Sequence, residues 1–229
     1  MPVIAVLNQS RLDDADVAFY TAAVDAQLRE DLPGVWPAIE YTPATFFASA
    51  KDLPVASGIA RLMVIQDTID NPGALGYHDF EGVPRSVILA QGAQTSVTMS
   101  HEALEMSADP NADRWVKMPD GREVAVEICD PCEADTYSKL VTIMGADRYV
   151  TVSNFILPAW FDASAPGPYD RLGTVPGPFA MARGGYEIIL GKDGGVTDVW
   201  GQSEPTSFVR RLLKVTNSTS RTFRRGVRL

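Results

Sequence analysis

One short segment constrains this chain more than any other, because it places three chemically active side chains on one predicted helix. Residues 95–108 are expected to be helical, with Thr95, Ser96 or Thr98 as the cap, and Asp109-Pro110 is expected to end the helix because a residue before proline avoids helical geometry. Within it, His101 and Glu105 are four positions apart, so they lie about 40° apart around the axis and about 6 Å apart along it. Zinc accepts imidazole nitrogen and carboxylate oxygen. The spacing therefore predicts that both side chains bind one metal ion.

Glu102 completes the pattern His-Glu-x-x-Glu. In HExxH metallopeptidases the glutamate after the first histidine is the general base that acts on metal-bound water. The pattern therefore predicts a catalytic role for Glu102. Here Glu105 stands where those enzymes have a second histidine, and a carboxylate makes the metal a weaker Lewis acid. The site is then compatible with zinc or with a harder cation such as calcium, and Glu102 would only contact the ligands.

A third metal ligand is expected from the acidic residues that follow the helix. Asp130 is preferred, because it follows a predicted strand within Cys-Asp-Pro. Asp109 lies about 80° around the helix from His101 and is an alternative. Glu127 is spaced like the downstream glutamate of thermolysin-like enzymes and is the other alternative.

His78 is the only other histidine. It precedes residues 86–90, which we expect to be the edge strand along which a peptide substrate would lie. His78 would then orient a substrate or a ligand. The interpretation favoured from the sequence is an ordinary loop histidine with satisfied hydrogen bonds.

Five short segments of the chain form a series: residues 73–79, 100–106 with Asp109-Pro110, 127–133, 152–162 and 184–186. In this order they resemble a group of zincin-like proteins from tailed bacteriophages and some bacterial genomes. Phage members are described as neck zincins, attached near the head-to-tail connector. The resemblance covers about residues 64–190. It implies a mixed α/β zincin-like fold and a place in a phage particle, without establishing catalysis.

The resemblance leads to one expected function and one alternative. The expected function is a structural protein of the virion, assembled in the host cytoplasm and present in several copies or as a homo-oligomer. Its partners would be other neck, portal or tail proteins, and its cofactor zinc. The alternative is an active zinc-dependent peptidase or cell-envelope hydrolase that acts on a peptide or cell-wall substrate through Glu102.

Charge divides the chain unevenly. The net charge is −9, yet residues 208–229 carry seven basic residues and no acidic one, which leaves 13 basic and 29 acidic residues, a balance of −16, for the rest. We therefore expect a zincin-like domain at 1–200 and a basic arm at 201–229, either solvated or docked on an acidic partner. Nucleic-acid binding is not favoured, because only Phe223 interrupts the basic residues as a stacking aromatic.

The remaining features are structural. No apolar run approaches the roughly 18 residues needed to span a bilayer. Cys129 and Cys132 form one close pair and are interpreted as packing thiols. Strands are expected at 2–7, 61–67, 86–90, 149–157 and 186–190, an irregular strand at 35–47, a helix at 13–31 capped by Asp13 or Asp14, a hairpin at 115–118 and 123–128, and a linker at 191–203.

Overall fold

A five-stranded mixed sheet organises the first half of the computed structural model, which describes residues 2–71 and 74–201. Its strand order is β2-β1-β3-β5-β4, with β4 alone antiparallel to its neighbour. The strands are β1 (Val3–Gln9), β2 (Ala44–Phe47), β3 (Ile59–Gln66), β4 (Gly76–Phe80) and β5 (Pro84–Leu89). In the inner strand β1, the four consecutive residues Ile4–Leu7 are apolar and buried, which is typical of a strand inside a parallel sheet.

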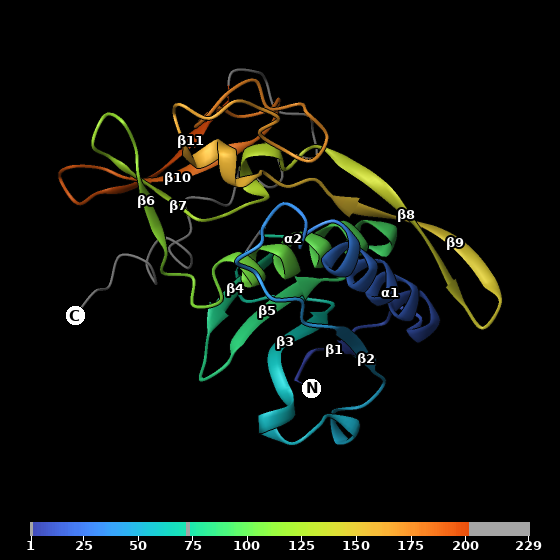
Figure 1. Cartoon of the computed structure of the whole chain (residues 1–229). Coiled ribbons are helices and arrows are strands. Elements are labelled where there is room, and N and C mark those ends of the chain that lie inside the picture. Colours follow the sequence, from blue (N-terminus) through green and yellow to red (C-terminus); the bar gives the residue numbers. More distant parts are fainter. Residues whose placement is uncertain (1, 72–73, 202–229) are drawn as a thin grey trace.

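Two helices lie side by side over this sheet (Figure 1). The first, α1 (Asp14–Glu30), begins at Asp13, whose side chain accepts a hydrogen bond from the Ala15 amide at 2.8 Å, which confirms the predicted cap. The second, α2 (Thr95–Ala108), has the predicted bounds. Its cap prediction was wrong: Gln94 is the N-cap and makes no side-chain capping bond. Thr95 Oγ1 instead accepts from the Gln91 amide.

Nearly all of α2 is buried, since Ser107 is the one helical residue with more than marginal exposure. A polar network at its centre fixes its position. Ser100 Oγ donates to Gln27 Oε1 on α1 at 2.7 Å and accepts from the Ser153 amide at 2.9 Å. Gln27 Nε2 donates to the Ser153 carbonyl at 2.8 Å. These bonds tie together α1, α2 and the end of β9 in a region without access to water.

The second half of the chain builds two smaller sheets above α2 (Figure 1). One is antiparallel, ordered β11-β10-β7-β6, and consists of β6 (Trp115–Lys117), β7 (Glu123–Ala125), β10 (Tyr186–Leu190) and β11 (Val196–Trp200). The other is the hairpin of β8 (Thr136–Ile143) and β9 (Ala146–Ser153), which extends away from the body of the molecule. Short 3₁₀ turns occur at η1 (Ala50–Asp52), η2 (Ala56–Gly58), η3 (Gly92–Gln94), η4 (Asp130–Cys132) and η5 (Pro158–Phe161).

The fold is thus mixed α/β, as predicted, with three local corrections. Residues 35–47 are not one strand, because turns precede β2 and only Ala44–Phe47 pairs with β1. Residues 191–203 are not simply a linker, because Val196–Trp200 pairs with β10. The strand at 86–90 is not at the edge: β5 lies between β3 and β4, and β4 forms the border.

Two further predictions concern membrane-spanning segments and the basic arm. Among the described residues, no helix has both the length and the apolar character needed to cross a membrane. The basic arm at 201–229 lies outside the described residues, apart from Gly201.

Candidate metal centre

His101 and Glu105 project from the same face of α2, as the helical spacing predicts. His101 Nε2 lies 3.1 Å from Glu105 Oε1. Two ligands at about 2.0–2.1 Å from a tetrahedral zinc ion are separated by about 3.3–3.4 Å. The pair is therefore close to the spacing that one shared cation requires.

Asp130 reaches the same imidazole nitrogen from a distant segment. It begins the η4 turn, and its Oδ1 lies 3.1 Å from His101 Nε2. Two contacts of the Pro131 carbonyl fix the position of this turn. The Ala182 amide donates to it at 2.8 Å, and Gly185 packs so closely that a Cβ there would lie only 2.1 Å from the carbonyl oxygen. A residue without a side chain is therefore required at position 185 for the turn to sit where it does. The structure brings Glu105 and Asp130 to the same nitrogen of His101.

Cys129 lies in the same cluster. The His101, Glu105 and Cys129 donor atoms lie within 4.8 Å of one another, so Cys129 could also bind a metal ion. Burial, followed by the nearby Glu105 charge, raises the pKa of the Cys129 thiol well above its usual value, so the thiol is neutral when no metal is bound. Its Sγ contacts the His101 carbonyl at 3.7 Å. Cys129 and Cys132 are both buried and are not joined by a disulfide.

Burial and opposite charge compete at this centre. Burial alone would lower the pKa of His101, but Glu105 and Asp130 outweigh it and raise that pKa well above its usual value. Burial raises the pKa of Glu105 to about 7, against the opposing effect of His101. Without a cation, His101 and Glu105 are therefore expected to retain a proton near neutral pH, and a bound cation would compete with that proton.

His78 belongs to this region, which the sequence analysis did not favour. It is a buried residue of strand β4 and not a loop histidine. Its Nδ1 lies 3.2 Å from Glu102 Oε2 and 3.7 Å from Glu105 Oε2. A Cβ on Gly76 would meet Thr98 Cγ2 at 2.6 Å, so the glycine allows β4 to approach α2 this closely.

The two alternative third ligands have different surroundings. Asp109 ends α2, and its carboxylate oxygens accept hydrogen bonds from the Asp113 amide at 3.1 Å and the Arg114 amide at 3.0 Å. Glu127 is buried, and its Oε2 lies 3.8 Å from His78 Nε2. The Asp109 carboxylate therefore stabilises the turn after the helix, whereas the Glu127 carboxylate lies next to His78.

Glu102 also lies within the cluster. Its side chain is 2% exposed and is directed at His78.

Comparison of the chain with protein-family models, curated proteins and solved structures finds no match. The chemistry of the centre therefore rests on its own geometry.

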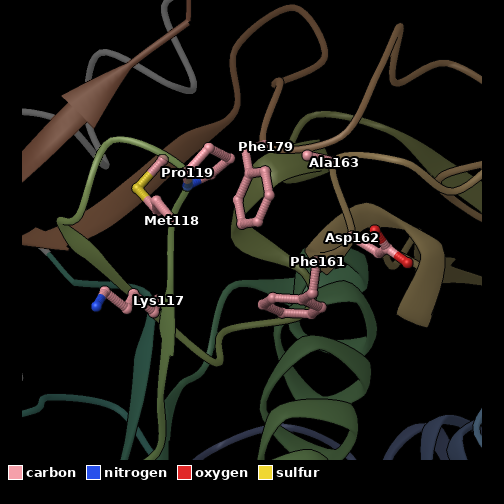
Figure 2. Close-up of a pocket in the computed structure, with 7 residues that line it drawn as sticks. All are labelled: Lys117, Met118, Pro119, Phe161, Asp162, Ala163 and Phe179. Atoms are coloured by element: carbon pink, nitrogen blue, oxygen red, sulfur yellow. The ribbon is translucent and has the colours of Figure 1, made fainter.

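A shallow pocket of about 300 Å³ lies elsewhere, at the junction of β6 and η5 (Figure 2). Its lining consists of Lys117, Met118, Pro119, Phe161, Asp162, Ala163 and Phe179. The rings of Phe161 and Phe179 stand on one side, opposite Met118 and Pro119. None of the residues around His101 is part of this lining.

His78 was undervalued because it forms no recognisable spacing with His101, and Glu127 was ranked below Asp130 although its spacing resembles that of the downstream glutamate in thermolysin-like enzymes. The available signal was the composition of the segments: the only two histidines of the chain lie in segments that also carry acidic residues. Their approach depends on the position of β4 at the sheet border, next to β5, which no local pattern specifies.

Proposed function

We propose that this protein is a structural subunit of a tailed-phage particle, zincin-like in fold, located at the neck, and stabilised by a divalent cation, zinc, bound by His101, Glu105 and Asp130. The observation that carries the metal site is that one imidazole nitrogen lies 3.1 Å from a carboxylate oxygen of each of two segments. A cation at this position would connect α2 to the η4 turn.

The enclosure of the centre favours a structural role over catalysis. The side chains of His101, Glu105 and Asp130 are 9%, 0% and 1% exposed. This burial leaves a substrate little access to a cation bound there. A closed site contributes its binding energy to the folded state.

A place in the particle is supported by the resemblance of the five segments and by the surface of the β8–β9 hairpin. Leu140 and Tyr149 are directly paired across the hairpin and are 53% and 74% exposed, and Met144 at its tip is fully exposed. Such an apolar patch on a projecting element is suited to contact with a neighbouring subunit.

The test has two parts. Protein purified without added chelator should contain zinc, whereas His101→Ala should contain little. Antibody labelling of purified particles should place the protein near the head-to-tail connector. Metal-free wild-type protein that also fails to take up zinc would refute the metal site, and particles that lack the chain would refute the structural assignment.

The second candidate is a metal-dependent hydrolase. It is supported by the position of Glu102 next to His101 within the buried cluster, from which it would take a proton from the attacking water. Casein and purified cell-wall material would be incubated with the zinc-loaded protein and with Glu102→Gln. Hydrolysis by the wild type that is lost in the variant would favour the enzyme, and equal inactivity of both would exclude it for these substrates.

A further inference from the structure

The Glu105 carboxylate faces both histidines of the chain, each with a different oxygen. Oε1 lies 3.1 Å from His101 Nε2, and Oε2 lies 3.7 Å from His78 Nδ1. A carboxylate can bind two cations, one through each oxygen. We propose that His78, Glu105 and Glu127 form a second divalent-cation site, so that Glu105 bridges two cations. This rests on the proposed site at His101, Glu105 and Asp130.

The tautomer of His78 is linked to its contact with Glu102. Which atom carries the proton in the 3.2 Å contact between His78 Nδ1 and Glu102 Oε2 depends on the tautomer of the imidazole, and an ionised Glu102 would accept from Nδ1. In that tautomer the lone pair is on Nε2, so Nε2 would bind the cation, and the 3.7 Å between Nδ1 and Glu105 Oε2 shows only that Glu105 lies beside the ring. Histidine ligands in metal sites usually donate their other N–H to a carboxylate in this way, which fixes the ring and its tautomer. Glu102 is thus a positioning residue for His78.

The distance between His78 Nε2 and Glu127 fits a shared cation. Nε2 is 3.8 Å from Glu127 Oε2, which is too long for a hydrogen bond. Ligands at about 2.0–2.2 Å from one ion lie about 3–4 Å apart. One ligand atom from each of His78, Glu105 and Glu127 lies within 4.8 Å of the other two.

The charge of the cluster also suits two cations. The carboxylates of Glu102, Glu105, Glu127 and Asp130 are all buried, and the two imidazoles are neutral when they bind metal. One divalent cation balances two of the four negative charges, and two cations balance all of them. A buried charge without compensation is costly, so loading of both sites is the better-balanced state.

Zinc stoichiometry tests the second site. Chelator-treated protein would be dialysed against Zn²⁺ alone and its metal measured by mass spectrometry, with circular dichroism as the check on folding. Wild type should bind two zinc ions per chain, and His78→Gln, Glu127→Gln and Asp130→Asn should each bind one. Glu187→Gln, which alters a buried glutamate outside the cluster, should still bind two. One zinc in the wild type overturns the second site alone, and none overturns the proposed function as well.

A second measurement tests the bridge and does not require any variant to fold. Wild type loaded with two equivalents of Mn²⁺ should give the broadened electron paramagnetic resonance signal of a coupled pair. A resolved spectrum of isolated Mn²⁺ at full loading would overturn the bridging role of Glu105.

The role of Glu102 is tested by two substitutions. Glu102→Leu should lower zinc affinity at the second site about 10–100-fold and leave the first site unchanged, because only the orientation of His78 is lost. Glu102→Gln retains a hydrogen-bond acceptor and should restore most of that affinity. An equal loss at both sites in Glu102→Leu would contradict the positioning role.

Discussion

Asp130 lies with its carboxylate 3.1 Å from His101 Nε2, although 29 positions separate the two residues. We expect Asp130→Asn to weaken zinc binding at this site about 10–100-fold or more, because the amide keeps the shape but loses the charge. Asp109→Asn is the matched control. It alters the carboxylate that accepts from the Asp113 and Arg114 amides, so it should lower stability without changing zinc affinity. Isothermal titration with Zn²⁺ measures both, and the reverse result would make Asp109 the third ligand.

Removal of metal should lower the melting temperature. A ligand present at about 100 times its dissociation constant stabilises the folded state by about 2.7 kcal/mol. For a chain of this size the melting temperature should therefore fall by roughly 5–10 °C when a chelator is added. Differential scanning fluorimetry with and without chelator measures the shift. An Asp130→Asn variant that responds as strongly as the wild type would contradict the assigned ligands.

The network at Ser100 predicts a loss of stability that is independent of metal. Ser100→Ala would leave Gln27 Oε1 and the Ser153 amide without their present partner in a buried region, at a cost of about 1–3 kcal/mol. Ser107→Ala on the same helix removes only a hydroxyl that donates to the Ala103 carbonyl, in a half-buried position. Chemical denaturation in the presence of chelator should separate the two variants. Equal losses would show that the network contributes little.

Glu187 should make stability depend on pH. Burial raises its pKa to about 7, and Arg122 only partly offsets this. Between about pH 4.5 and 7 the folded chain therefore keeps a proton that the unfolded chain has released, so stability falls as the pH rises through this window and is constant above it. The Glu187→Gln variant should gain about 1–3 kcal/mol over the wild type when the pH is raised from 4.5 to 8.

Because His101 and Glu105 also titrate, the difference between Glu187→Gln and wild type is the informative quantity. Glu40→Gln alters an exposed carboxyl and serves as the control. Denaturation curves at several pH values give the free energies of unfolding. A difference in the free energy of unfolding that does not change with pH would contradict the raised pKa of Glu187.

The basic arm provides a prediction about assembly. Seven basic residues and no acidic residue lie between positions 208 and 229. If the arm docks on an acidic neighbour, deletion of residues 208–229 should reduce incorporation into particles, and a variant with the basic residues changed to glutamine should behave similarly. Quantitative immunoblotting of purified particles measures the incorporation. Normal incorporation of both variants would remove the docking role.

The sequence predicted what depends on local periodicity. The bounds of α2, the Asp13 cap of α1 and the turn between β6 and β7 all follow from spacing, capping and turn residues within a few positions. The projection of His101 and Glu105 from one face of α2 follows in the same way.

What could not be predicted depends on sheet order and on close approach of distant segments. The pairing of β4 outside β5 places His78 against Glu102, and nothing within residues 76–80 encodes that neighbour. The strand β11 was missed because its five residues follow the glycine-rich segment 191–195, which resembles a linker. The antiparallel pairing of β11 with β10, which a local sequence pattern does not show, provides the interstrand hydrogen bonds of this strand.

Because Gly185 packs against the Pro131 carbonyl, the position of Asp130 depends on a residue more than 50 positions later in the sequence. Any larger residue at 185 would displace the turn that carries Asp130, because its Cβ would lie against the Pro131 and Asp130 carbonyls. The donor atoms are therefore specified jointly by a strand at the sheet border, a helix and two later turns. A peptide corresponding to α2 would retain the spacing of His101 and Glu105 but none of this enclosure, so the cation affinity proposed here would belong to the assembled chain and not to the motif.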